Sequence, residues 1–373
     1  MKKLDTLNVI QAIVFVFIVV SCDIVKNIDP IIYKGDISTL KKESVNLSSM
    51  ESSNCYIVSE PGIYSFATVK GNSTEAIGPV VSAHVLWESA GTSRQPSKGS
   101  ILQGALYDDG MIYFKTAASY CEGNSVIVAK DVLGKILWSW HIWLTDQPEE
   151  LLYSNDAGII MDRNLGATSA NSDDVASLGL LYQWGRKDPF LGSSSINANL
   201  LAQSTMVWPR PVPSNSSIGT IDYAISHPTE FITQNTNNYD WYYSINSSTD
   251  NTRWTTSDMR KSVYDPCPGG WRVPDGGSRS VWKKANIMPV DTTAADHGFF
   301  FTCSQQSSSW YPFTGSRSSK DGGSTLVGRN GYYWTASSSG NHAYALNFGY
   351  DGNINILYSS YRAFAFAVRC QKE

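Results

Sequence analysis

The chain has 373 residues, of which 42% are hydrophobic and 12% aromatic, and its formal net charge is −4. This length suits two domains, and the apolar fraction is sufficient for each to bury a core. Because the charge is mixed, slightly acidic and without basic runs, nucleic acid is not an expected partner.

The N-terminus predicts export and a lipid anchor. Lys2 and Lys3 precede an apolar run at residues 9–20, which is too short for a stable membrane-spanning helix and is typical of a signal peptide. Residues 19–22 read Val-Val-Ser-Cys and resemble a bacterial lipobox, which implies that Cys22 becomes the lipidated first residue. We therefore expect a signal peptide over 1–21, a polar tether over 22–53, and an outer-membrane lipoprotein at the cell surface. The alternative is an ordinary secretory signal that ends near a cysteine.

Residues 54–146 alternate like an all-β module. Asp-Asp-Gly at 108–110 and Asp-Val-Leu-Gly at 131–134 each separate two alternating runs, so each predicts a hairpin. Short strands at this spacing favour an immunoglobulin-like β-sandwich. His141 lies between two tryptophans and is more typical of a hydrogen-bonded structural residue than of a ligand-binding one. Residues 54–58 and 136–143 resemble the N-terminal modules of surface lipoproteins and fimbrillin-like proteins of Bacteroides-type bacteria, which implies a spacer that raises the second domain off the membrane.

A linker is expected over 147–154 and a second domain over 155–373. An apolar strand is predicted at the start of residues 159–167. A helix is predicted from Ser172 or Asp173 to Trp184, with Gly185 as its stop, and a short helix near 280–285 carries Trp282. The stretch 191–254 has no clear period, and loops of that length are usually functional or mobile.

Three short strands are predicted between Gly331 and Cys370. By alternation, one face carries Tyr344, Leu346, Phe348 and Tyr350 in the first, Ile354, Ile356 and Tyr358 in the second, and Phe364, Phe366, Val368 and Cys370 in the third. The third strand is apolar on both faces, so it should be central and buried. The segments between are rich in Ser, Asn, Gly, Asp and Tyr, which favours a binding surface on exposed loops; simple turn formation is the alternative.

Five ordered blocks carry a family resemblance over about residues 155–373. They are Met-Asp-Arg-Asn-Leu at 161–165, Leu-Tyr-Gln-Trp-Gly-Arg at 181–186, Cys-Pro-x-Gly-Trp-Arg-Val-Pro at 267–274 with Trp282, Gly-Tyr-Tyr-Trp-Thr at 331–335, and Phe-Ala-Val-Arg-Cys at 366–370. Together they resemble the Fibrobacter succinogenes major paralogous domain, which is similar to the formylglycine-generating-enzyme group. The resemblance implies an α+β C-type lectin-like fold for the second domain.

The same fold carries the variable proteins of diversity-generating retroelements, whose diversified positions near the C-terminus form the ligand surface. The resemblance places on such a surface Tyr333, Trp334, Ser337, Ser338, Asn341, His342, Tyr344, Asn347, Tyr350, Asp351, Asn353, Asn355, Tyr358, Ser359 and Tyr361. It implies a non-catalytic binding protein whose partner is a protein or glycan at the cell surface. The alternative is a structural or adhesive fimbrial subunit, at a pilus tip, that contacts other fimbrial subunits.

The cysteines and charged residues indicate neither a metal nor a cofactor. A bridge between Cys267 and Cys370 is predicted, with two separate thiols as the alternative, whereas a pair between Cys55 and Cys121 remains open. The cysteine spacings match no zinc site. The close cysteine pair of the formylglycine-generating enzymes is missing, as are nucleophile elbows and phosphate loops, so no catalytic residue is expected.

The segment that begins with Asp351 has part of the pattern of a calcium-binding loop. Asp351, Asn353 and Asn355 have the alternate spacing that opens a calcium loop. The turn glycine is replaced by Ile356, and Arg362 occupies the position of the bidentate glutamate. An exposed polar strand face is therefore the preferred interpretation.

Overall fold

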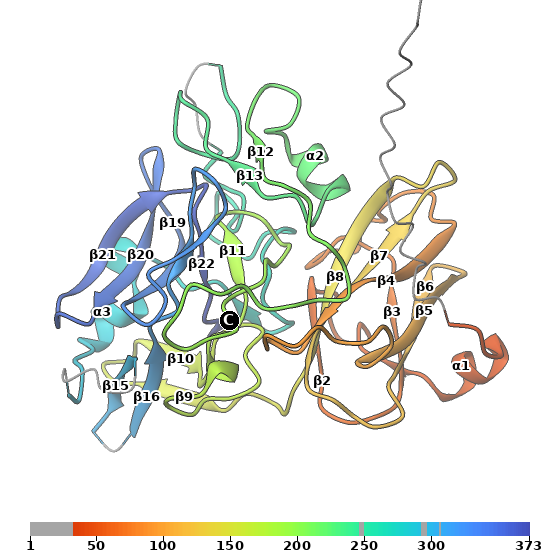
Figure 1. Cartoon of the computed structure of the whole chain (residues 1–373), viewed down its shortest axis with the longest axis horizontal. Helices are drawn as coiled ribbons and strands as arrows, with labels where there is room; N and C mark the ends of the chain where they lie inside the picture. The colour runs from red at the N-terminus through yellow and green to blue at the C-terminus, as the bar shows by residue number, and fades with distance from the viewer. Residues whose placement is uncertain (1–32, 246–249, 292–296, 306) are drawn as a thin grey trace, which may run out of the picture.

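The computed structural model describes residues 33–245, 250–291, 297–305 and 307–373 (Figure 1). These residues form mostly β-sheet with a few short helices. The predicted signal peptide, Cys22 and the first part of the predicted tether lie outside the described residues. Within the described part of the chain, no helix is long and apolar enough to cross a membrane.

The N-terminal part consists of two four-stranded sheets. The outer sheet has the order β1 (Val45–Asn46), β3 (Ile63–Ala67), β6 (Met111–Thr116) and β5 (Leu102–Asp108). The inner sheet has the order β2 (Cys55–Val58), β8 (Ile136–Leu144), β7 (Gly123–Lys130) and β4 (Ser82–Ser89), and it lies toward the rest of the molecule (Figure 1). Phe66 and Phe114 of the outer sheet share one buried cluster with Val85 and Trp140 of the inner sheet. The sheets therefore pack face to face, as the alternation predicts.

Both predicted hairpins form. Asp108 pairs with Met111, and the two residues between them, Asp109 and Gly110, have φ angles of 44° and 78°, which a tight two-residue turn requires. In the second hairpin, the Asp131 carboxylate accepts hydrogen bonds from the backbone N–H groups of Leu133 and Lys135, both at 2.9 Å. Local turn chemistry thus sets the register of both pairs.

His141 is a buried structural residue, as predicted. Its Nε2 lies 2.8 Å from Oδ1 of Asn124, and the side chain is fully enclosed in the inner sheet. Burial lowers the pKa of His141 to about 3, so the imidazole is neutral at pH 7.

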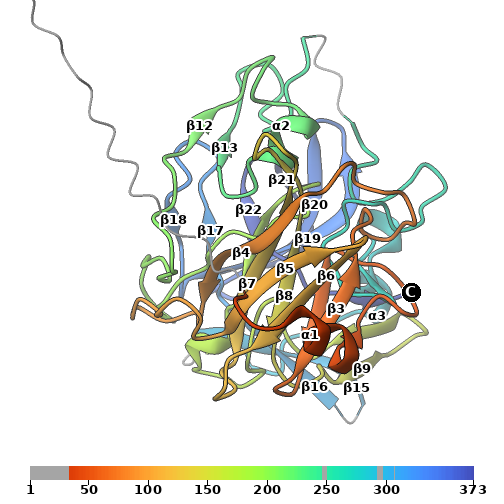
Figure 2. The same ribbon diagram turned by 90° about the vertical axis from the view of Figure 1, so that its right-hand side faces the viewer.

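The segment before Asn54 is more ordered than the predicted tether. Asp36 caps α1 (Ile37–Glu43) by accepting a hydrogen bond from the Ser38 N–H at 3.0 Å. β1 then pairs in parallel with β3, and this places α1 against the outer sheet (Figure 2). The expectation of a structureless tether is therefore wrong for these residues, because Leu40 buries its side chain completely and the strand completes a sheet edge.

The expected linker 147–154 also contains a strand. β9 (Glu150–Tyr153) pairs antiparallel with β10 (Gly158–Met161), and β10 pairs with β23 (Gln371–Lys372), the last strand of the chain. β14 (Trp271–Arg272) completes this sheet in the order β14-β23-β10-β9. The linker residues thus belong to the second part of the molecule.

A larger sheet carries the C-terminal segment. Its strands run in the order β18 (Ser324–Thr325), β17 (Ser316–Arg317), β22 (Ala365–Ala367), β19 (Asn330–Ser339), β20 (His342–Gly349) and β21 (Ile354–Tyr361), and β11 (Leu181–Gln183) pairs with β22. Around it lie β12 (Val212–Pro213) with β13 (Ile232–Thr233), β15 (Gly298–Ser304) with β16 (Ser307–Pro312), and the helices α2 (Ile221–Ser226), α3 (Val281–Ala285), η1 (Val175–Ser177) and η2 (Gly277–Arg279). The third predicted strand, β22, is central and fully buried, as expected.

The predicted helix at 173–184 is wrong. Only the single turn η1 forms there, and β11 follows it as a strand paired with β22. Gly179 adopts a φ of 72°, and a Cβ at that position would meet the Leu165 carbonyl oxygen at 2.9 Å. The left-handed conformation of Gly179 separates η1 from β11, so Val175 and Tyr182, which would share a helical face, lie in different elements.

A bulge changes the faces of the C-terminal hairpin. Ala345 pairs with Tyr358 and Asn347 pairs with Asn355, so β21 carries one more residue than β20 across this interval. Ile354 and Ile356 therefore pack in one core cluster, whereas Tyr358 packs against the other. The prediction that these three share a face is wrong for Tyr358.

Cys267 and Cys370 form the predicted disulfide, with a Cα–Cα distance of 6.0 Å. Cys55 and Cys121 remain free thiols, as does Cys303, so the open possibility of a Cys55–Cys121 pair is not realised.

Buried polar contacts join the two parts of the molecule. Asn54 Nδ2 donates to the carbonyl oxygens of Val263 and Asp265, both at 2.8 Å. Lys187 Nζ donates to the Asp188 carboxylate at 2.7 Å and to the Ser139 carbonyl oxygen of β8 at 3.1 Å. Separating the two parts would remove the hydrogen-bond partners of these buried polar groups. The N-terminal sandwich is therefore packed against the C-terminal part.

Candidate functional site

Two of the predicted surface residues are core residues. Tyr333 is fully buried; it stacks on Phe348 with ring centroids 5.7 Å apart and donates a hydrogen bond to the Pro312 carbonyl oxygen at 2.7 Å. Trp334 is also fully buried and donates through Nε1 to the Tyr182 carbonyl oxygen at 2.9 Å. Their assignment to a ligand surface is wrong, because consecutive residues of β19 point into the cores on its two faces.

The other predicted residues divide by exposure. Ser337, Ser338, His342, Tyr344, Asn347, Tyr358 and Tyr361 are half-buried, whereas Asn341, Tyr350, Asp351, Asn353, Asn355 and Ser359 are exposed. Several serve the framework: Ser337 Oγ accepts from the Gly276 N–H at 2.9 Å, and Asn347 Nδ2 donates to the Gly331 carbonyl oxygen at 3.0 Å.

In the exposed turn between β20 and β21, the Asp351 carboxylate finds its hydrogen-bond partners within the turn. Asp351 accepts hydrogen bonds from Asn353, through the side-chain Nδ2 at 2.6 Å and the backbone N–H at 3.2 Å. Tyr350, beside it, is 61% exposed and has the Arg329 guanidinium 6.0 Å from its ring centroid. In the described part of the chain, no group of three or more His, Cys, Asp or Glu side chains could hold a metal ion.

A continuous row of aromatic rings includes two of the predicted residues, Tyr358 and Tyr361. We call the aromatic row the set Tyr358, Tyr332, Phe366, Phe364, Tyr361 and Tyr239, whose successive ring centroids lie 5.8, 4.7, 5.6, 6.4 and 4.6 Å apart. Four of its five contacts are stacked. His342 stacks on Tyr361 from β20, with centroids 5.0 Å apart. The row brings together residues from β19, β21, β22 and the loop that follows β13.

An open groove of about 520 Å³ lies along the first part of this row. Its aromatic wall consists of Tyr332, Tyr358, Phe364 and Phe366, and its polar wall consists of Ser316, Ser318, Lys320, Asp321, Ser324 and Thr325 from the β17–β18 hairpin. Ser360 also lines it. Of the residues predicted for the ligand surface, Tyr358 alone lines this groove.

The hairpin that forms the polar wall is held by its own hydrogen bonds. Ser318 N–H donates to the Gly323 carbonyl oxygen and Gly322 N–H to the Ser318 carbonyl oxygen, both at 2.8 Å. Asp321 accepts from the Gly323 N–H at 2.9 Å, and this bond is the main reason that the pKa of Asp321 is lowered. Beneath the turn, the buried Arg317 donates through Nε to the Gly322 carbonyl oxygen at 2.7 Å. The polar wall is therefore held in a fixed shape, and the Asp321 carboxylate on it is ionised.

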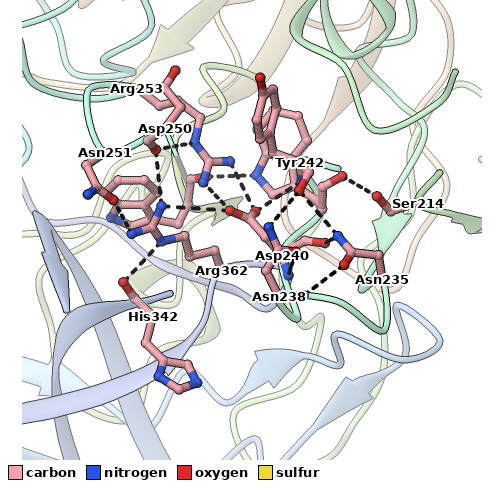
Figure 3. Close-up of polar contacts among 12 residues, drawn as sticks. Ser214, Asn235, Asn238, Asp240, Tyr242, Asp250, Asn251, Arg253, His342 and Arg362 are labelled. Carbon is pink, nitrogen blue, oxygen red and sulfur yellow. Dashed lines mark hydrogen bonds and ion pairs between the residues drawn. The ribbon is translucent and has the colours of Figure 1, made fainter. Parts of the chain in front are cut away.

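A buried charge network fixes the far end of the aromatic row (Figure 3). Asp240 follows Tyr239 directly, and its carboxylate pairs with both guanidinium nitrogens of Arg253 and lies 3.8 Å from Nη1 of Arg362. All three side chains are fully buried. Burial, with the like charge of Arg253 as a second cause, lowers the pKa of Arg362 to about 9, so it is still charged at neutral pH.

Arg362 forms hydrogen bonds with segments that are distant from one another in sequence. It donates to the carbonyl oxygens of His342 at 3.0 Å, Gly340 at 2.9 Å and Asp250 at 3.1 Å, and it lies over the Trp184 ring at 4.3 Å. Residues 250 and 251 are thereby fastened to the β19–β20 turn. Tyr239, which directly precedes Asp240, is thereby held against Tyr361.

Two titrating groups at this surface, His342 and Tyr332, are neutral near pH 7. Burial, and next the Arg362 charge, lower the pKa of His342, while burial raises the pKa of Tyr332 to about 12. The surface accordingly offers ring faces, hydroxyl groups and the single charges of Lys320 and Asp321. Such a set suits noncovalent recognition.

Sequence reasoning missed Tyr332, Phe364, Phe366 and the β17–β18 hairpin as site components. Phe364 and Phe366 were expected in the core by alternation, and Phe366 is indeed 1% exposed while contributing one groove-facing edge. The Ser- and Gly-rich run at 315–325 signals a turn, but nothing local indicates that it faces β21.

No protein-family model, curated protein or solved structure matches the chain. The functional conclusion accordingly depends on the residues and their geometry.

Proposed function

We propose that the protein is a non-catalytic, lipid-anchored binding protein of the outer membrane that captures a cell-surface ligand in the groove beside the aromatic row. In this proposal the C-terminal part is a C-type lectin-like domain, the N-terminal sandwich is an immunoglobulin-like spacer, and Cys22 carries the lipid. The observation that carries it is the open groove with one aromatic and one hydroxyl-bearing wall.

The groove has the properties of a preformed site. Its volume of about 520 Å³ falls within the range of small-molecule and oligomer sites. Tyrosine rings supply contact area at low entropic cost, and serine and threonine supply adaptable hydrogen bonds. Because both walls are held by internal contacts, little ordering remains to oppose binding.

The proposal also restricts where a diversified surface could lie. Substitutions that change ligand choice without unfolding the chain must fall on residues that reach solvent, such as Tyr358, Ser359 and Tyr361. Tyr333 and Trp334 are excluded from such a set because their side chains fill the two cores. Sequencing this locus across isolates tests this directly.

The experiment is a comparison of Tyr358→Ala with Tyr350→Ala as a matched control. Both remove a tyrosine from the same hairpin, but Tyr358 lines the groove and Tyr350 is 61% exposed outside it. The labelled full chain is applied to arrays of surface glycans and of envelope proteins. We expect Tyr358→Ala to weaken the captured signal at least about tenfold, which corresponds to ~1.4 kcal/mol, and Tyr350→Ala to leave it unchanged. Equal effects of the two variants would refute the groove as the binding site.

A further inference from the structure

We propose that the ligand of the groove is a neutral oligosaccharide; this inference rests on the proposed function and specifies its ligand class. The two walls differ in chemistry in a way that matches a pyranose ring. A pyranose has faces of C–H groups, which pack on aromatic rings, and edges of hydroxyl groups, which need hydrogen-bond partners. The aromatic wall presents the first kind of surface and the β17–β18 hairpin the second.

The hydroxyl groups on the polar side are available for a ligand. Ser324 and Thr325 line the groove and are half-buried, and their side-chain oxygens have no hydrogen-bond partner among the described residues. Ser316 and Ser360 line it as well but are only 2% and 6% exposed. Each hydroxyl can donate one hydrogen bond and accept others, so it can pair with a sugar hydroxyl in either direction. An apolar peptide side chain in the same place would bury these groups unpaired, which opposes binding.

The charges favour a neutral sugar. The groove is lined by one cation, Lys320, and one anion, Asp321, and both side chains are exposed. The Asp321 carboxylate keeps its charge because its pKa is lowered, and a carboxylate accepts well from sugar hydroxyls. Because Lys320 and Asp321 balance, the groove has no net charge that would attract a sialylated or phosphorylated chain, and such a chain would also meet Asp321 as a like charge.

The length of the aromatic row favours more than one sugar unit. The row leaves the groove at Phe364 and continues to Tyr361 and Tyr239, the latter 42% exposed. A further sugar can therefore pack on the exposed ring of Tyr239 while the first occupies the groove. A monosaccharide would leave this outer part of the row unused.

The test uses the full chain with neutral tetrasaccharides of glucose, galactose, mannose and N-acetylglucosamine, and with one sialylated tetrasaccharide, in ligand-observed saturation-transfer NMR. At least one neutral probe should bind, with the strongest transfer to its axial C–H protons, and the sialylated probe should bind more weakly. Tyr358→Phe should keep this binding and Tyr358→Ala should lose it, while Thr325→Val should weaken it about two- to tenfold by removing one hydrogen bond. Tyr350→Ala serves as the control, and the thermal transition verifies folding of each variant.

The outcomes separate the two proposals. If no neutral tetrasaccharide binds but an envelope protein is captured in a Tyr358-dependent manner, the saccharide inference is wrong and the proposed function stands. If a saccharide binds equally well to Tyr358→Ala, it binds elsewhere, and this inference is likewise overturned. If neither glycans nor proteins depend on Tyr358, both proposals fail.

Discussion

Replacing Asp240 by Asn should destabilise the fold strongly, because this carboxylate is the only anion between two buried arginines in the described network. Arg253 donates to it at 3.1 Å through Nη1, Arg362 lies 3.8 Å away, and the three side chains have no exposed surface. Asparagine keeps the shape and can still accept the Tyr242 N–H, which lies 3.1 Å from Oδ1 of Asp240. It removes the charge and replaces Oδ2, which accepts from Arg253 Nη2, by an N–H donor.

The expected loss follows from the burial of the network. Removing one partner of a buried ion pair leaves an uncompensated charge and costs about 3–5 kcal/mol, whereas a domain is stable by only about 5–15 kcal/mol in total. Asp258→Asn is the control, because Asp258 and its partner Arg260 are 57% and 80% exposed and an exposed ion pair contributes little to stability. Urea unfolding of both variants measures the difference.

Asp240→Asn should weaken ligand capture as well as lower stability, because Tyr239 is then no longer held against Tyr361. Hydrogen exchange should then show faster exchange in the loop of residues 235–245 than in β19 or β20. A loss of unfolding free energy no larger than that of Asp258→Asn would refute the assignment of this network as the fastening of the loop.

Two further predictions concern pH and the anchor. Burial lowers the pKa of His141 from 6.5 to about 3, so below pH 6.5 the unfolded chain takes up a proton that the folded chain does not. Stability should therefore fall as the pH falls from 6.5 toward 3. His141→Gln should make the slope of the unfolding free energy between pH 6 and 4 shallower by about 1.4 kcal/mol per pH unit. An unchanged slope in urea titrations would contradict this. Cys22→Ser, expressed as the full chain, should lose palmitate labelling and leave the membrane fraction, whereas Cys121→Ser should remain there; membrane retention of both would argue against the lipid anchor.

Local patterns predicted the elements whose structure is decided locally. The Asp109-Gly110 turn and the hairpin at 131–134 form because their residues favour those backbone angles and turn hydrogen bonds wherever they occur. The disulfide between Cys267 and Cys370 was also predicted, since it joins the start of the second core to the end of the chain.

Predictions failed where contacts distant in sequence decide the structure. The helix expected at 173–184 is replaced by β11 because pairing with β22 and the left-handed conformation of Gly179 outweigh local periodicity. The bulge in β21 carries no local signal, yet it moves Tyr358 to the face where the groove lies. Arg362 was considered only as an unsuitable calcium-loop residue, whereas its fastening role depends on partners more than a hundred residues away.

The candidate site was predicted in part for the same reason. Tyr358 and Tyr361 were placed on the surface by the family resemblance. The groove itself combines the β17–β18 hairpin with β19, β21 and β22, and no single segment contains enough of it to be recognised. Alternation also could not reveal that both faces of β19 are covered, so Tyr333 and Trp334 were assigned to the surface.

The most direct test of the central claim is to fill the groove and measure binding. Ser324→Trp places a large ring on the polar wall without altering the aromatic row, and Leu133→Trp adds the same ring to a residue that is 89% exposed in the sandwich. Using whichever ligand the arrays identify, we expect Ser324→Trp to raise the Kd at least about tenfold, and Leu133→Trp to leave it unchanged, with equal thermal transitions. Unchanged affinity in Ser324→Trp would contradict the groove as the site of ligand capture.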